Sequence, residues 1–268
     1  MMMQQISIAE VTPQFAALLP DDVPVVMRRT AVLTDKLPGK ILTDDPRQPS
    51  WVIIWEAGDG TVYWCGAISA EIVQVVVDRL RQEGEVLIPF WSKADPIVLH
   101  LPSDPDFEGS AMDFIVRDTT VDLDQILARL PQNLELRPAD LALFERTYWY
   151  ADNVRLAGSA EAYLATARAF YLLRGEEILC EASTGPLIDG VRELGILTHE
   201  PFRGRGYATL TCACLIREME KVGERPFWNC STQNLASITV ARKLGFVNEK
   251  VFEFVWYRPI GEKNHGII

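Results

Sequence analysis

The sequence has few cysteines, and their spacing is not that of a metal site or a disulfide framework. Five occur among 268 residues, an odd number, and none forms a CxxC or Cys/His pattern: Cys65, Cys180, Cys212, Cys214 and Cys230. Scattered cysteines of this kind disfavour a structural zinc site. We therefore expect no bound metal and a reducing, cytoplasmic compartment.

Long apolar runs and a positive net charge are also absent. No apolar segment approaches the ~20 residues that span a bilayer, and the N-terminus lacks the basic and then apolar order of a signal peptide. The net charge is −11, with 10 basic and 20 acidic side chains in residues 1–130 but 16 and 17 in residues 131–268. Because nucleic-acid binding needs a basic surface, we expect neither a nucleic-acid nor a membrane partner.

The length and the step in charge favour two domains. The first half shows strand and helix patterns in alternation, with strands expected over residues 23–28, 51–57, 61–65 and 85–91 and helices over 69–83 and 121–130. This order predicts an α/β or α+β unit. Pro131 ends the last helix, so we place the boundary there: residues 1–130 form an N-terminal domain of unknown role, and residues 131–268 form the second domain.

The second half contains a strand, a glycine-rich loop and a helix in succession. Residues 193–198 are predicted to be a strand, Arg203-Gly204-Arg205-Gly206 is the loop, and a long amphipathic helix follows from Tyr207. This order presents backbone N–H groups to a phosphate, and the glycines allow close approach. The loop is therefore either a pyrophosphate cradle or an ordinary β-to-α turn with solvated arginines.

A second helix, expected over residues 234–244, follows a predicted strand at residues 226–231. Strand, helix and strand predict a βαβ unit with parallel strands. Ligands bind at the carboxyl ends of such strands, so the start of this helix is expected near the glycine loop. Asn234 and Ser237 then either cap the helix or hydrogen-bond the same ligand.

A dinucleotide site of the Rossmann type is the competing interpretation. It requires G-x-G-x-x-G, and Gly204 and Gly206 fit, but Thr209 occupies the third position. The acidic ribose partner expected at the end of the next strand is also missing, because that strand carries Asn229 and Cys230. The sequence therefore disfavours this site.

Together these motifs resemble the acetyl-CoA site of the GNAT superfamily of N-acetyltransferases. The loop pattern (Q/R)-x-x-G-x-(G/A) is met by Arg203, Gly206 and Ala208, and the later N-x-x-(A/S) and G-F motifs are met at residues 234–237 and 245–246. The resemblance covers about residues 133–258. The segments 193–198 and 228–231 are similar to the bacterial subgroup that includes the zwittermicin-resistance-type acetyltransferase.

The resemblance implies an α/β (α+β) fold with a GNAT-type mixed central sheet flanked by helices. The smaller α/β N-terminal domain would then be a degenerate GNAT-like half. The implied cosubstrate is acetyl-CoA, with a backbone N–H near Leu197 as oxyanion contact. The implied cofactor-binding residues are Leu197, Thr198, Arg203, Gly204, Arg205, Gly206, Tyr207, Ala208, Asn234 and Ser237.

The catalytic groups are less well indicated. Glu193 is the first candidate for the base, although a salt-bridged role is equally open, and His199 is a second candidate. The superfamily often places a tyrosine acid where this chain has Ala241. Cys230 is expected to be a buried, inert thiol rather than a nucleophile. Tyr148 to Tyr150 either cover the acceptor, as in the family, or pack.

The implied activity is direct acetyl transfer to the amine of a small molecule. A non-catalytic acyl-CoA-binding or sensor module is the alternative, because the usual acid is missing at Ala241. An acceptor that is a protein N-terminus or lysine also stays open. The sequence does not fix the oligomeric state, and a homodimer is compatible with it.

Overall fold

The computed structural model describes residues 3–91 and 96–261, and the chain divides into two compact units. The first unit combines residues 1–111 with 251–268, and the second comprises residues 112–250. Both boundaries fall inside long strands, β6 (Phe107–Arg117) and β12 (Phe246–Trp256). The expected boundary near residue 130 therefore differs from the division of the structure. Residues 112–130 belong with the second unit because α4 (Leu123–Leu127) packs on its helix α8.

The first unit is built on an antiparallel run of strands. β1 (Gln4–Ile6), β2 (Gly39–Thr43), β3 (Trp51–Glu56) and β4 (Thr61–Gly66) pair in that order. Helix α3 (Ala70–Gln82) then leads to β5 (Ile88–Trp91), which is parallel to β4 and antiparallel to the last part of β12. The remaining helices of this unit are η1 (Ile8–Glu10), α1 (Pro13–Ala16), α2 (Val26–Leu33) and η2 (Pro96–Leu99).

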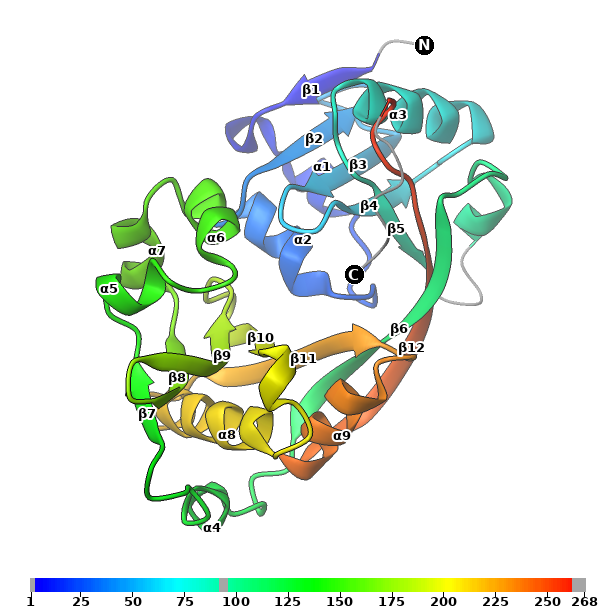
Figure 1. Ribbon diagram of the computed structural model, residues 1–268. Helices are drawn as coiled ribbons and strands as arrows, with labels where there is room; N and C mark the ends of the chain where they lie inside the picture. The colour runs from blue at the N-terminus through cyan, green and yellow to red at the C-terminus, as the bar shows by residue number, and fades with distance from the viewer. Residues whose placement is uncertain (1–2, 92–95, 262–268) are drawn as a thin grey trace. The chain divides into compact units, whose positions relative to one another are not determined.

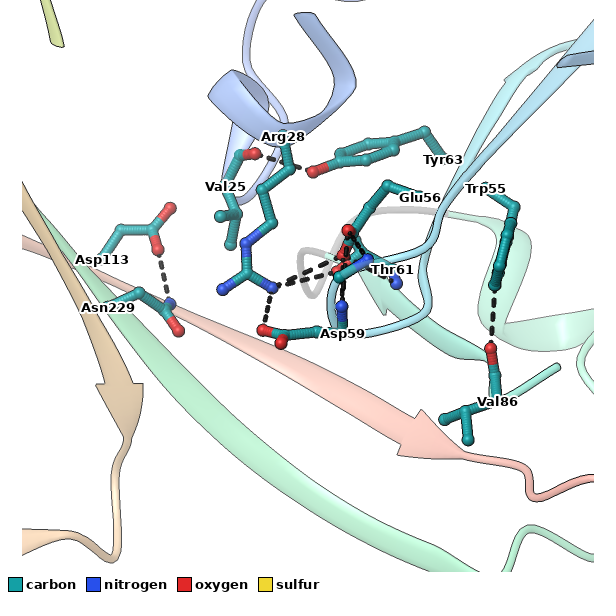
Figure 2. A network of polar contacts seen from close by, with 11 residues as sticks. Val25, Arg28, Trp55, Glu56, Asp59, Thr61, Tyr63, Val86, Asp113 and Asn229 are labelled. Atoms are coloured by element: carbon teal, nitrogen blue, oxygen red, sulfur yellow. Dashed lines mark hydrogen bonds and ion pairs between the residues drawn. The ribbon is translucent and has the colours of Figure 1, made fainter. Parts of the chain in front are cut away.

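Both faces of the first unit's sheet are buried. Alternate side chains of a strand point to opposite faces, so Trp51 and Ile53 join the cluster under α3, whereas Val52 and Ile54 join the cluster with Phe15. Arg28 and Glu56 form an ion pair at 3.6 Å, and Glu56 accepts the Thr61 N–H (Figure 2). The Glu56 carboxyl closes the β3–β4 turn, and its burial raises its pKa.

The second unit repeats this order on a larger scale. β7 (Glu135–Pro138), β8 (Ala169–Arg174), β9 (Glu177–Thr184) and β10 (Val191–Thr198) form an antiparallel run. Helix α8 (Tyr207–Glu220) packs on β8 and β9 (Figure 1) and leads to β11 (Arg225–Ser231), which is parallel to β10. The other helices are α5 (Leu141–Phe144), α6 (Tyr150–Ala157), α7 (Ala160–Thr166), η3 (Glu200–Phe202) and α9 (Leu235–Lys243).

The core of the second unit lies between the sheet and helices α8 and α9. Leu215, Met219, Trp228 and Phe246 are all nearly or fully buried there. Gly245 has φ +90°, and a Cβ at this position would lie 2.7 Å from the Asp118 carbonyl oxygen, so glycine is required before Phe246. The predicted mixed α/β fold, with two similar halves in tandem, is confirmed. Among the described residues, no helix has both the length and the apolar character needed to cross a membrane.

Candidate functional site

Strands β10 and β11 are neighbours over a short length and then separate. In the described part of the chain, their parallel ladder joins residues 191–193 to residues 225–227, whereas β10 stays paired with β9 through Thr198. Beyond Glu193, one edge of β10 therefore faces a gap in the ladder. This gap includes the Ile196–Thr198 segment of β10.

The direction of each backbone group on β10 follows from the pairing with β9. The Gly185 N–H donates to the Glu193 carbonyl (2.9 Å), and the His199 N–H donates to the Leu179 carbonyl (3.1 Å). Backbone groups alternate between the two edges of a strand, so the N–H of Leu197 also points to β9. The N–H groups of Ile196 and Thr198 point to the open edge instead. The N–H groups at this edge are therefore those of the two neighbours of Leu197, near which the oxyanion contact is expected.

Polar contacts join β10 to the start of β11 at the closed end and bond β11 to β6 beyond it. At the closed end, Glu224 is 8% exposed and bonds Arg192 (2.9 Å) and Arg168 (2.5 Å). Desolvation raises the pKa of Glu224, but the two arginines outweigh it and lower the pKa to about 2. Farther along β11, the Asn229 amide donates to Asp113 of β6 at 2.7 Å (Figure 2). β11 thus stays bonded to β6 while β10 stays bonded to β9.

The glycine loop lies at the end of the open edge of β10. Gly204 (φ +77°) and Gly206 (φ +80°) are left-handed, and among the described residues no neighbouring atom lies within 4 Å of a Cβ built on either. Gly206 is the N-cap of α8 and has no side chain that could cap the helix. The Arg203 Nε donates to the Thr198 carbonyl (3.1 Å), and Arg205 donates to that of Pro201 (3.4 Å). Exposed N–H groups, two arginines and open space fit an anionic ligand.

The two candidate ligand contacts at the start of α9, Asn234 and Ser237, have structural partners. The Asn234 Oδ1 accepts the Ser237 N–H at 3.0 Å, which is the capping role, and the Ser237 Oγ accepts the Trp228 Nε1–H at 3.0 Å. Asn234 is exposed at the helix start. Ala241 is fully buried in the core beside Trp228. A tyrosine at this position would not fit without displacing core side chains.

The remaining candidate residues differ in how far their side chains are buried. Cys230 is 9% exposed, and burial raises the pKa of its thiol, so the expected inert role fits and a thiolate nucleophile does not. Tyr150 packs edge-on against Phe144 with centroids 5.2 Å apart. Tyr148 is 58% exposed. Glu193 is half-buried on β10.

Side chains on β10 alternate between two faces. Leu194 and Ile196 pack into the core under α8. Gly195 faces the opposite side, where a Cβ would lie 3.8 Å from the Trp149 indole. Glu193 and His199 lie on the same face as Gly195 by the alternation of the strand.

An acidic residue that the sequence analysis did not select lies on that face. The Glu181 side chain of β9 is 1% exposed, and one of its oxygens is 2.8 Å from the His199 Nε2. The Tyr148 N–H donates to the same carboxyl at 3.1 and 3.2 Å. Burial raises the pKa of Glu181, while Tyr148 and His199 oppose that rise. A lone glutamate inside the apolar run Ile178–Ala182 was the available signal.

Several solved structures share the fold of this chain. A GCN5-related N-acetyltransferase-like protein from Streptococcus suis superposes with TM-score 0.69 and 22% identity, covering 90% of this chain and 96% of that one. A GCN5-related N-acetyltransferase from Sphaerobacter thermophilus gives 0.62 and 12%, covering 96% of both chains. A tandem GNAT protein from the clavulanic acid biosynthesis pathway gives 0.59 and 13%, covering 98% and 99%. These likenesses concern the fold.

No curated protein matches the sequence significantly. The profile of the GNAT acetyltransferase family, however, matches residues 28–255. This range is wider than the expected 133–258 and includes most of the first unit. The chain therefore belongs to the GNAT acetyltransferase family.

Proposed function

We propose that this protein is an acetyl-CoA-dependent N-acetyltransferase that transfers the acetyl group directly to the amine of a small molecule. The observation that supports this most strongly is the continuity of the open β10 edge with the glycine loop at the start of α8. An extended pantetheine chain can follow the edge while its pyrophosphate lies at the loop.

The loop is proposed to bind the pyrophosphate. Backbone N–H groups of residues 205–208, including those of Tyr207 and Ala208, point toward an anion at the helix N-terminus. Arg203 and Arg205 add positive charge, and Gly204 and Gly206 leave space for the phosphates. The Asn234 amide and the Ser237 hydroxyl are proposed as further contacts from the start of α9.

The open edge of β10 is proposed to bind the pantetheine and the thioester. The N–H groups of Ile196 and Thr198 face this edge, where the β10–β11 ladder has ended. One of them is placed to donate to the thioester carbonyl oxygen, on which negative charge develops as the amine attacks. The Leu197 N–H points to β9, so Leu197 contributes only its side chain, which lies on the same face as Gly195.

Acetyl transfer also requires a proton acceptor for the amine. Glu193 and His199 both lie on the Gly195 face of β10, three residues to either side of Ile196, which is roughly 10 Å along a strand. Both groups are therefore candidates for the base. Position 241 on α9 is a buried alanine, so this helix does not supply the tyrosine acid there. We propose that water protonates the departing thiolate.

The acceptor is proposed to be a small cationic amine. The first 130 residues carry 20 acidic and 10 basic side chains, which favours the approach of cations. The segments 193–198 and 228–231 support the finer assignment to the zwittermicin-resistance-type subgroup. No observation favours a protein N-terminus as acceptor over a small molecule.

The test is release of free CoA thiol from acetyl-CoA in the presence of single amines: spermidine, ethanolamine, glucosamine and a dipeptide with a free N-terminus. Turnover with one of the first three supports the proposal. Turnover with the dipeptide alone would assign a peptide acceptor. Tight binding of acetyl-CoA without turnover on any amine would favour the acyl-CoA-binding alternative.

A further inference from the structure

The β9–β10 pair carries a buried carboxylate that bonds two different segments. In the strand register Glu181 lies opposite Leu197, and its carboxyl lies 2.8 Å from the His199 Nε2. The Tyr148 N–H reaches both carboxyl oxygens, at 3.1 and 3.2 Å. One side chain therefore fixes both the ring at the end of β10 and the chain just before α6.

The partners of Glu181 decide which nitrogen of His199 carries the proton. When it is ionised, the Glu181 carboxylate can only accept hydrogen bonds, so the His199 Nε2 donates to it. The other ring nitrogen, Nδ1, then holds a lone pair. The His199 side chain is 33% exposed, whereas that of Glu181 is 1% exposed. The partly exposed His199 can therefore meet a substrate, whereas the buried Glu181 contacts only its protein partners.

The pair lies beside the proposed thioester edge. His199 follows Thr198 directly, and the face that it shares with Gly195 is covered in part by the Trp149 indole. Glu181 holds the Tyr148 backbone, so it also sets the position of the neighbouring Trp149. Glu193, in contrast, lies opposite Phe227 where β10 and β11 are still paired.

We infer that Glu181 and His199 form the proton-accepting pair of the acetyl transfer, with His199 Nδ1 as the base and Glu181 as the residue that positions it. This inference rests on the proposed function. The acceptor ammonium gives one proton to Nδ1, and the resulting amine forms a bond to the thioester carbonyl carbon. The C–S bond breaks, the thiolate takes a proton from water, and the amide nitrogen loses its remaining extra proton to solvent. The buried charge of Glu181 stabilises the imidazolium.

The test compares His199→Ala, His199→Gln and Glu181→Gln in the full chain, at saturating acetyl-CoA with the amine found by the thiol assay. His199→Ala should lower kcat by about 100-fold or more, with the acetyl-CoA Kd unchanged, and added imidazole should restore part of the loss. His199→Gln keeps a donor to Glu181 and should be as inactive. His100→Ala is the control and should behave as wild type.

Glu181→Gln separates positioning from packing, because its amide oxygen can still accept the Tyr148 N–H. It should lower kcat more than it raises the amine KM, and ¹⁵N NMR should show His199 moving from the Nε2-protonated tautomer to a mixture. A kcat within threefold of wild type for both His199 variants would overturn the inference, as would loss in Glu193→Gln alone. If the wild-type chain binds acetyl-CoA but acetylates no amine, the inferred proton-accepting pair is contradicted, whereas the acetyl-CoA site is retained. Absence of acetyl-CoA binding overturns the proposed function as well.

Discussion

Glu224 shows how one buried charge holds the closed end of the site. It bonds Arg192 and Arg168, and its pKa is about 2. Because the folded-state pKa lies below the unfolded value near 4.3, its contribution is complete above that value and is lost as the pH falls toward 2. Glu224→Gln should therefore lower the free energy of unfolding at pH 7 by about 3 kcal/mol.

Urea unfolding at pH 7 and at pH 3 or below measures this effect. Glu249→Gln is the matched control, because Glu249 also bonds an arginine through both oxygens, at 2.8 and 2.9 Å from Arg242, but the Arg242 side chain is 58% exposed. The control should lose less than about 1 kcal/mol. Equal losses in the two variants, or a Glu224→Gln loss that does not shrink in acid, would contradict this account.

Single residues also show where sequence reasoning stops. The loop from Arg203 to Gly206 and the pair Asn234 and Ser237 are found by local spacing, because a helix start needs particular residues within one turn. Glu181 was missed because its partner His199 is 18 positions away, and the β9–β10 register alone brings them together. Ala241 could be noted as an unusual residue, but its burial could not be predicted.

Helix α8 offers a test of the loop at the scale of an element. Gly206 and Gly223 lie at its two ends and both have positive φ, and in the part of the chain that the structure describes no neighbouring atom lies within 4 Å of a Cβ at either position. Alanine at either position should cost about 1 kcal/mol of stability, since the strain is in the backbone alone. Gly206→Ala should in addition weaken acetyl-CoA binding about tenfold, because its Cβ would lie at the proposed phosphate site.

Calorimetric titration with acetyl-CoA and thermal unfolding of both variants measure the two effects separately. Gly223→Ala, which lies at the far end of the helix, should keep the wild-type Kd. An unchanged Kd in Gly206→Ala would place the phosphates elsewhere.

Strand β10 gives a second test, on the face opposite α8. A Cβ at Gly195 meets the Trp149 ring and the Ser183 hydroxyl at ordinary contact distances of 3.7–3.8 Å, so alanine fits. The two extra methyl groups of valine would press on the indole. Gly195→Val should raise the KM for the amine about tenfold and leave the acetyl-CoA Kd unchanged, whereas Gly195→Ala should change neither by more than twofold. A Gly195→Val variant with the wild-type amine KM would show that the acceptor does not use this face.

Whole elements were predicted with uneven success, for physical reasons. The strands and the helix around the loop have clear periodicity and were found. Residues 23–28 were predicted as a strand, but α2 begins at Val26, and its buried face packs on β3. Strand β6 was not predicted, since it begins in a Pro/Asp-rich stretch and its neighbours in the sheet, β11 and β12, are distant in sequence.

At the scale of the whole molecule, the two units share a topology but not a loop. In the first unit β4 and β5 are parallel over residues 61–62 and 88–89 in the described part of the chain, as β10 and β11 are in the second. However, β4 joins α3 through residues 67–69, the Ser69 side chain caps α3, and Glu71 lies in its first turn. A capped helix start with an acidic first turn disfavours a phosphate.

The chain boundary follows from the same tandem arrangement. The sequence placed it where Pro131 ends a helix, which is a local signal. In the structure β6 and β12 each contribute residues to both units, and such shared strands leave no linker composition that a sequence pattern could reveal. Because the first unit has a capped, acidic helix start where the second unit has the glycine loop, we propose one acetyl-CoA site per chain, in the second unit.

Isothermal titration of the full chain with acetyl-CoA tests this central claim most directly. The account predicts saturable binding of one acetyl-CoA per chain, and Arg203→Ala should weaken it by about tenfold because it removes a charge beside the phosphates. Ser69→Gly, in the loop of the first unit, should leave both the stoichiometry and the Kd unchanged. Two sites per chain, an Arg203→Ala variant with wild-type affinity, or no binding at all would contradict the account.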